Sequence, residues 1–285
     1  MKIFLFALLS ILIFSSCNKG FVNNENENAL TITDESNITS NSQIQGQTPV
    51  FANICASVKG YTIKLPNDYS TTTKKKYPLL VYLHGLGVCG NGTTQLYKVT
   101  KNGVSELLQT GKFPEKFTVN GKSYKFIVVT PQFNNPYMYS HDIKAVIDYI
   151  KNNYRTDPTR IYLTGMSLGG GATVNFCDSF ATTLAAAVPM ASCWPPPFES
   201  IANSAVSSKL PMWFFHNRYD KDTTTPPSNS IDLVNLINSY SPPIPAKITL
   251  FNSTSHDCWT KGYSTGYKEN NMNIYQWMLQ YVRKP

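Results

Sequence analysis

The sequence is poor in residues that bind metals, with only four histidines and six cysteines among 285 residues. No two of them have the spacing that a zinc site would need, so we expect neither a metal nor another cofactor. Basic residues outnumber acidic ones by 25 to 17, but no basic motif is interleaved with aromatic residues, which argues against nucleic acid as a partner. The net charge of +8 favours solubility, with a preference for acidic glycans or anionic surfaces as the alternative.

The chain also lacks a long apolar run at its N-terminus. Lys2 is followed by about a dozen apolar residues, too few to span a bilayer comfortably, and by small residues before Cys17. This pattern is typical of an export signal over residues 1–17. The residues before Cys17 resemble the lipobox of bacterial lipoproteins, although Phe14 stands where leucine is usual. We expect export and membrane attachment through lipidated Cys17, facing periplasm or cell surface; the alternative is an ordinary secretory signal.

The next segment, residues 18–50, is rich in Asn, Ser, Thr, Gln and Glu and poor in aromatic residues. Such a composition cannot bury enough apolar surface to fold, so it predicts a disordered polar tether. Residues 51–285 are enough for one large domain with a substantial core. We expect signal, tether and a single catalytic domain, and we make no prediction of the oligomeric state.

Within this domain, short apolar runs recur with helix-like segments between them. Tyr61–Pro66 alternates like a half-buried edge strand, whereas the later runs are continuous, as in a parallel sheet covered on both faces. These later runs are Tyr77–Leu83, Phe126–Val129, Arg160–Leu163, Leu184–Met190, Leu210–Phe215 and Ala246–Phe251. Alternating strands and helices predict an α/β fold with its active site at the carboxyl ends of the strands.

Gly165-Met-Ser167-Leu-Gly169 is a G-x-S-x-G motif that directly follows one of these runs. In a sharp strand-to-helix turn, this motif holds the serine in a strained conformation with its hydroxyl exposed. The flanking glycines let neighbouring backbone pass without Cβ clashes. The pentapeptide alone is a weak signal, but its place after a strand makes Ser167 the candidate nucleophile.

A glycine-rich segment, His84-Gly-Leu-Gly87, follows the run Tyr77–Leu83. Enzymes with a nucleophile turn of this kind use one backbone N–H from such a loop and one from the residue after the serine as an oxyanion hole. We therefore expect Leu86 and Leu168 to supply these donors, which would stabilise a developing oxyanion. A plain glycine-rich turn is the alternative.

A general base must take the proton of the serine, and only four histidines are available. His84 precedes the expected oxyanion loop, and His141 precedes Ser167 in the chain. His216 ends a strand. Only His256, after the last strand, leaves room for an acid between itself and Ser167, in the order Ser, acid, His.

Two carboxylates compete for the role of that acid. Asp220 and Asp222 both follow the run Leu210–Phe215. Asp220 is closer to the strand end and is preferred, which leaves Asp222 as a turn or capping residue.

Longer stretches around these residues resemble α/β-hydrolases of the predicted-peptidase and carbohydrate-esterase group. This group includes feruloyl and acetylxylan esterases and dienelactone-hydrolase-like enzymes. The matching stretches are residues 77–85, 129–132, 157–167, 210–216 and 256–259. The chain departs from the group at Asn217, where a glycine is common. The resemblance implies an α/β-hydrolase fold with a mostly parallel central sheet, helices on both faces, and a Ser-His-Asp triad.

The favoured function is a secreted serine esterase that hydrolyses acetyl- or feruloyl-type esters, on a glycan or a small molecule, through an acyl-enzyme. A serine peptidase of the same fold is the alternative, and a non-catalytic glycan-binding lipoprotein is a third reading. Aromatic residues in the expected cleft loops suit stacking on a sugar or an aromatic acyl group, with ordinary packing as the alternative. The candidate cleft residues are Gln132, Trp194 and Trp259, with Phe133 and Tyr137 nearby.

Five cysteines lie beyond Cys17, so at least one is not paired within the chain. Cys193 and Cys258 fall in loops that border the cleft of an α/β-hydrolase, and export permits disulfides. We expect a bond between them, with two free buried thiols or a Cys55–Cys89 bridge as the alternatives.

Overall fold

The computed structural model describes residues 43–70 and 74–283. The predicted signal over residues 1–17, with Cys17, and the tether as far as residue 42 lie outside the described residues. Across the part of the chain that the structure describes, no helix has both the length and the apolar character needed to cross a membrane.

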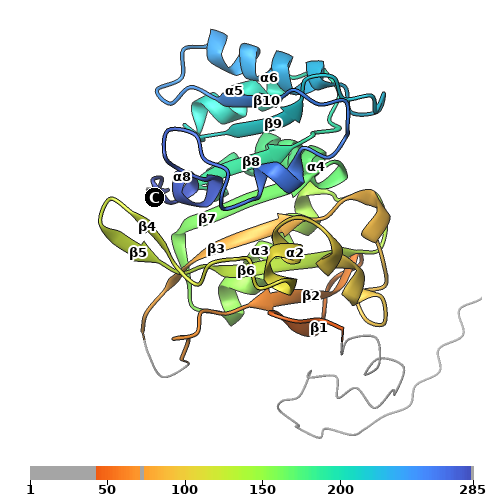
Figure 1. The fold of residues 1–285 in the computed structure, drawn as a ribbon, viewed down its shortest axis with the longest axis vertical. Coiled ribbons are helices and arrows are strands. Elements are labelled where there is room, and N and C mark those ends of the chain that lie inside the picture. The colour runs from red at the N-terminus through yellow and green to blue at the C-terminus, as the bar shows by residue number, and fades with distance from the viewer. Residues whose placement is uncertain (1–42, 71–73, 284–285) are drawn as a thin grey trace, which may run out of the picture. The chain divides into compact units, whose positions relative to one another are not determined.

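An eight-stranded sheet forms the centre of the fold, in the order β1-β2-β6-β3-β7-β8-β9-β10 (Figure 1). β1 and β2 pair antiparallel, as do β2 and β6, and all the remaining neighbours are parallel. The strands are β1 Thr48–Cys55, β2 Val58–Lys64, β3 Tyr77–Leu83, β6 Ile127–Phe133, β7 Thr156–Met166, β8 Ala186–Met190, β9 Trp213–Asn217 and β10 Lys247–Phe251, and a separate hairpin joins β4 Phe117–Val119 to β5 Lys122–Tyr124. The predicted, mostly parallel central sheet is confirmed.

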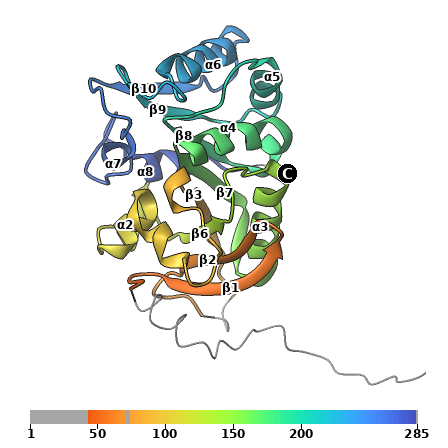
Figure 2. The ribbon, with the colours of Figure 1, turned by 90° about the vertical axis from the view of Figure 1, so that its right-hand side faces the viewer.

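Helices cover both faces of this sheet (Figure 2). One face carries α3, α4, α5 and α6, and the other carries α2, α7 and α8. Their bounds are α2 Gly103–Gln109, α3 Ser140–Asn153, α4 Leu168–Phe180, α5 Glu199–Ser207, α6 Pro227–Ser239, α7 Trp259–Gly262 and α8 Ile274–Leu279. Buried side chains form two clusters, one beneath each set of helices. β3, β6, β8 and β9 are buried along their whole length, which explains their continuous apolar sequences.

The antiparallel edge of the sheet differs from the prediction. β2 lies between β1 and β6, so the strand predicted from Tyr61–Pro66 is internal, and β1 is the edge. β1 begins at Thr48, within the segment predicted to be a tether. Gln47, just before it, is buried: its amide nitrogen donates to Ser105 O at 2.9 Å, and its oxygen accepts from Thr62 Oγ1 at 2.8 Å. These polar residues can be buried because their hydrogen bonds are satisfied.

The parallel strands β3, β7, β8, β9 and β10 bring their carboxyl ends to one edge of the sheet. The loops that leave this edge carry the nucleophile motif and the residues predicted to act with it. The sheet order therefore places in one region residues that are up to 170 positions apart in sequence, from Leu86 to His256.

Candidate active site

Ser167 occupies a sharp turn between β7 and α4. Its backbone has φ 53° and ψ −115°, a conformation that a non-glycine residue adopts only when its surroundings impose it. The Ser167 N–H donates to Met190 O at 2.9 Å, which ties the turn to β8. A Cβ on Gly169 would lie 2.2 Å from Leu83 O, and one on Gly165 would lie 2.2 Å from Gly169 O. Both glycines are therefore required for this close approach.

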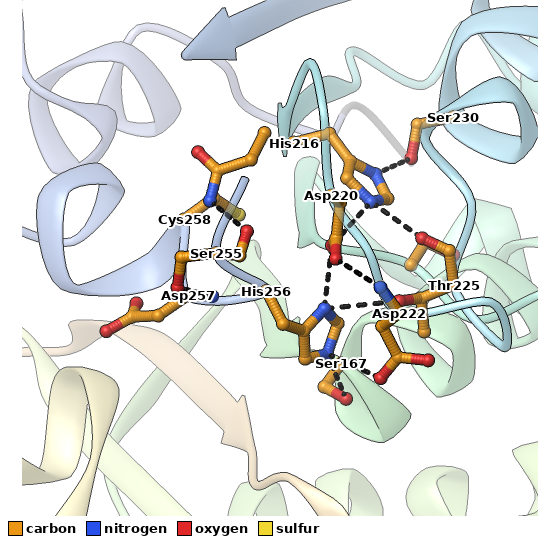
Figure 3. A network of polar contacts seen from close by, with 12 residues as sticks. Ser167, His216, Asp220, Asp222, Thr225, Ser230, Ser255, His256, Asp257 and Cys258 are labelled. Carbon is orange, nitrogen blue, oxygen red and sulfur yellow. Dashed lines mark hydrogen bonds and ion pairs between the residues drawn. The ribbon is translucent and has the colours of Figure 1, made fainter. Parts of the chain in front are cut away.

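Ser167, His256 and Asp220 form a continuous chain of hydrogen bonds (Figure 3). Ser167 Oγ lies 2.9 Å from His256 Nε2, and His256 Nδ1 lies 2.7 Å from Asp220 Oδ2. A carboxylate oxygen only accepts, so Nδ1 carries the proton and Nε2 is left to accept from the serine hydroxyl. The structure thus brings together the three residues predicted from the sequence, in the tautomer that proton abstraction needs.

The Asp220 carboxylate is fully buried and is held by several donors. His256 Nδ1 and, at 3.3 Å, His216 Nε2 face its Oδ2, and the Asp222 N–H donates to its Oδ1 at 2.9 Å. His216 Nε2 also faces Thr225 O at 3.0 Å, so this nitrogen carries the proton, and Nδ1 accepts from Ser230 Oγ at 2.9 Å. Burial lowers the pKa of His216, which keeps it neutral. Such donors are what a buried carboxylate needs in order to remain ionised.

Asp222, the rival for the acid position, lies on the other side of the histidine. Its Oδ2 is 3.9 Å from His256 Nε2, the nitrogen that faces Ser167. Its Oδ1 accepts from the Thr224 N–H and hydroxyl at 2.8 and 2.6 Å. The hydrogen bonds from Thr224 lower the pKa of Asp222. Asp220 therefore has the geometry of the acid partner, and Asp222 forms a turn, as the sequence favoured.

The two amides predicted for the oxyanion hole belong to segments that lie beside Ser167. Leu168 is the first residue of α4, and Leu86 begins a short 3₁₀ turn after β3. A Cβ on Gly85 would lie 3.3 Å from Met166 Cε, which shows how closely the two segments approach. Neither amide finds a hydrogen-bond acceptor in the described part of the chain. Both N–H groups are thus available to a substrate oxygen, and their role stays a prediction.

An apolar pocket of about 180 Å³ opens beside Leu168, the residue that follows Ser167. Leu168, Cys193 and Trp194 line one part of it, and Tyr137 and Tyr139 line another. The two tyrosine rings stack with centroids 6.0 Å apart. Trp194, a predicted cleft residue, thus lies in a pocket wall. The volume of this pocket is close to that of an apolar cavity that accepts one benzene ring.

Trp259 lies on another side of the site. Its ring meets the His256 ring edge to face, with centroids 5.1 Å apart. It also lines a second pocket of about 200 Å³, together with Glu106 and Tyr263. Trp259 therefore limits the positions that the His256 imidazole can adopt.

Gln132 was predicted as a cleft residue, and the structure contradicts this. Its side chain is fully buried in β6. The amide oxygen accepts from the Gly92 N–H at 2.8 Å, and the amide nitrogen donates to Val88 O and Gln95 O at 2.9 and 2.8 Å. Gln132 ties the loop after β3 to the sheet, so it has no free group for a substrate. Phe133, its neighbour, is also fully buried.

The predicted disulfide between Cys193 and Cys258 is wrong, because all five described cysteines are free thiols. Cys258 is buried and directs its sulfur to Phe215 O at 3.5 Å, whereas Cys193 Sγ faces Leu168 O at 4.0 Å. Both loops border the site, but the two sulfurs contact different segments, β9 and the start of α4. The alternative Cys55–Cys89 bridge is absent from the described residues as well.

Sequence reasoning missed two residues that contact the triad. Thr225 Oγ1 lies 3.1 Å from His256 Nδ1, and His216 contacts the carboxylate of Asp220. The position of His216 at the end of a strand, four residues before Asp220, was a usable signal. Thr225 carried no signal, because its approach depends on the path of the loop after Asp220.

His84 lies at the start of the loop that carries Leu86, and its environment predicts a pH-dependent stability. Its Nδ1–H donates to Gly85 O at 2.7 Å, and its Nε2 accepts from the Phe133 N–H at 3.0 Å. Burial lowers the pKa of His84 to about 4. Between pH 6.5 and 4 the unfolded chain binds the proton and the folded chain does not, so the free energy of unfolding falls as the pH falls.

This single group should lower the free energy of unfolding by about 2–3 kcal/mol between pH 7 and 4.5. Urea unfolding of the wild type and of His84→Asn at several pH values gives the free energy of unfolding of each protein as a function of pH. The dependence on pH should be steeper for the wild type. Asn keeps a donor near the Nδ1 position and does not titrate. His216, whose pKa is also lowered by burial, contributes equally to both proteins. Parallel curves for the two proteins would show that His84 is not the group responsible.

The fold and the hydrogen-bonded serine, histidine and aspartate define the chain as an α/β-hydrolase. A sequence model of the family described as "Putative esterase" matches residues 58–213, which is more than half of the chain. The chain belongs to this esterase family, which supports an ester hydrolase. No curated protein sequence matches it.

Solved structures agree with the fold. A thermostable esterase has 22% identity and a TM-score of 0.58 over 79% of this chain, and the chain covers 59% of that protein's length. FphF, a fluorophosphonate-binding serine hydrolase of Staphylococcus aureus, has 14% identity and a TM-score of 0.57 over 82% of this chain and 98% of its own. A ferulic acid esterase has 16% identity and a TM-score of 0.52, over 77% of this chain and 92% of its own.

Proposed function

We propose that this esterase works through Ser167, His256 and Asp220. His256 Nε2 takes the hydroxyl proton as Ser167 Oγ attacks the ester carbonyl, and Asp220 stabilises the resulting imidazolium. The amides of Leu86 and Leu168 donate to the oxyanion. His256 then returns the proton to the departing alcohol, which leaves an acyl-enzyme on Ser167. Water, deprotonated by His256, releases the acid and restores the serine.

The observation that carries this proposal is the hydrogen-bond chain from Ser167 Oγ to the buried Asp220 carboxylate, at 2.9 and 2.7 Å. Labelling with a fluorophosphonate probe tests it, because the probe reacts only with an activated serine. Peptide mapping should locate the label on Ser167. A label on another serine, or none on folded protein, would contradict the proposal and favour a non-catalytic binding protein.

We further propose that the substrates are acyl esters of glycans, with acetyl or aromatic acyl groups. The exposed rings of Tyr137 and Tyr139 and the pocket wall formed by Trp194 support this, because aromatic faces stack on sugars and aromatic acids. A panel of acetyl, feruloyl and longer acyl esters beside peptide amides tests the assignment. Faster hydrolysis of the amides than of any ester would instead identify a peptidase.

Export and lipidation at Cys17 are part of the same proposal. If lipid is attached to Cys17, the full-length protein should sediment with membranes, and Cys17→Ser should move it to the soluble fraction. Fractionation followed by immunoblotting measures this. A wild-type protein found wholly in the soluble fraction would contradict lipidation while leaving the esterase assignment intact.

A further inference from the structure

A second carboxylate lies beside the reacting groups without belonging to the triad. Asp222 Oδ2 is 3.9 Å from His256 Nε2, which is itself 2.9 Å from Ser167 Oγ (Figure 3). The triad acid, Asp220, occupies the opposite nitrogen of the same imidazole. An ester that reacts with Ser167 must approach the Nε2 edge of the His256 ring, and Asp222 lies at this same edge.

The local turn fixes the direction of the Asp222 side chain. Oδ1 accepts both the N–H and the hydroxyl of Thr224, and the backbone N–H of Asp222 donates to Asp220. The Thr225 N–H donates to the backbone carbonyl of Asp222 at 3.2 Å. These bonds use Oδ1 and leave Oδ2 directed at the site. The orientation is thus set before a substrate binds.

Among the described residues, no lysine or arginine lies within ion-pair distance of the Asp222 carboxylate. Within residues 43–70 and 74–283, His256 is the only basic group within ion-pair distance of it. Its side chain is 36% exposed, so a bound substrate can sense the charge. Burial raises the pKa of the Cys193 thiol in the pocket wall, and the Asp222 charge raises it further. The field of Asp222 therefore reaches the pocket beside Ser167.

We propose that Asp222 selects substrates by charge: it disfavours esters that carry a negative charge close to the scissile bond and favours neutral or cationic ones. This inference rests on the proposed function of Ser167. It also opposes a preference for acidic glycans, which is the alternative interpretation of the net charge of +8. Distant surface charges are screened by salt over about 8–10 Å, whereas a fixed charge at the reacting centre is screened much less.

The expected size of the effect follows from Coulomb's law. A substrate charge about 6 Å from Asp222, at an effective dielectric constant between 20 and 80, changes the rate ratio by roughly 3-fold to 100-fold. We expect a value near tenfold. Asp222 also stabilises the imidazolium and opposes the oxyanion, and these effects are shared by all esters of one alcohol. The ratio of two such esters isolates the substrate charge.

Asp222→Asn is a suitable variant because its side-chain oxygen can still accept from Thr224 and keep the turn. The probes are 2-naphthyl butyrate, its anionic analogue 2-naphthyl hemisuccinate, and the cationic 2-naphthyl 4-(trimethylammonio)butyrate. We expect Asp222→Asn to raise the anionic-to-neutral ratio of kcat/KM about tenfold and to lower the cationic-to-neutral ratio. Added salt should shift the wild-type ratios towards those of the variant.

Asp232→Asn serves as the matched control. It removes the same unit of charge from an exposed position of α6, and among the described residues Asp232 forms no hydrogen bond or ion pair with the triad. Its ratios should stay within twofold of wild type. Thr224→Val removes the hydroxyl that holds Asp222 and should give an intermediate ratio.

The outcomes separate this inference from the proposed function. Unchanged ratios in an active Asp222→Asn enzyme, or equal shifts in Asp232→Asn, would overturn charge selection by Asp222. A wild type that hydrolyses none of the three esters and takes up no fluorophosphonate would instead overturn the role of Ser167. In that case no ratio of kcat/KM can be measured, so a failure of the proposed function is distinguishable from a failure of charge selection.

Discussion

Ser167→Ala should lower kcat for ester hydrolysis by roughly 10⁵-fold or more, because it removes the atom that forms the acyl-enzyme. The residual rate would come from substrate binding and from the amide donors of the oxyanion hole. The fold should be preserved, since Ser167 Oγ makes its hydrogen bond only with His256 among the described residues. Steady-state hydrolysis and fluorophosphonate labelling measure the loss, and circular dichroism checks the fold.

Ser167→Gly is an informative companion to the alanine variant. Both remove the hydroxyl, but only glycine adopts the φ of 53° without strain. The glycine variant should be as inactive as the alanine variant, yet more stable to urea by about 1 kcal/mol. Activity within a few-fold of wild type in either variant would show that another residue is the nucleophile.

The parts of the site that could be predicted from the sequence are those fixed by the ends of buried parallel strands. Ser167 and His256 each follow an apolar run, and parallel strands bring their carboxyl ends to one edge. The glycines around Ser167 added the local turn, and the scarcity of histidine made elimination possible. The placement of these residues was predictable because strand order and strand ends determine where these loops lie.

The errors concern the direction of individual side chains and the use of polar residues inside the fold. Gln132 lies near the end of a strand of the right kind, β6, but its amide satisfies three backbone groups inside the fold. Cys193 and Cys258 lie in the expected loops, but their sulfurs contact different segments and form no bond. Gln47 has a polar sequence context, yet it is buried because Ser105 and Thr62 pair with it. Each outcome depends on contacts between distant segments, which composition and periodicity do not describe.

Asp220→Asn should lower kcat by roughly 10³- to 10⁴-fold, although it changes the size of the side chain very little. The backbone N–H of Asp222 donates to Oδ1, so the amide oxygen of the new side chain is held at that position. Its amide nitrogen then faces His256 Nδ1, which must become the acceptor. The proton moves to Nε2, and the imidazole can no longer accept the proton of Ser167.

The contribution of Asp220 can be separated from a general loss of negative charge by comparing it with Asp257→Asn. Asp257 follows His256 directly, but its carboxylate caps the next turn by accepting from the Thr260 N–H and hydroxyl at 2.8 and 2.7 Å. It does not contact the imidazole in the described structure, so its substitution should reduce kcat less than about fivefold. The two variants, measured by steady-state hydrolysis of one neutral ester, should therefore differ in kcat by at least a hundredfold.

Equal losses of kcat in Asp220→Asn and Asp257→Asn, or a larger loss from Asp222→Asn than from Asp220→Asn, would mean that the buried carboxylate does not orient His256. The tautomer argument would then fail together with the assignment of the acid, while the role of Ser167 would be unaffected.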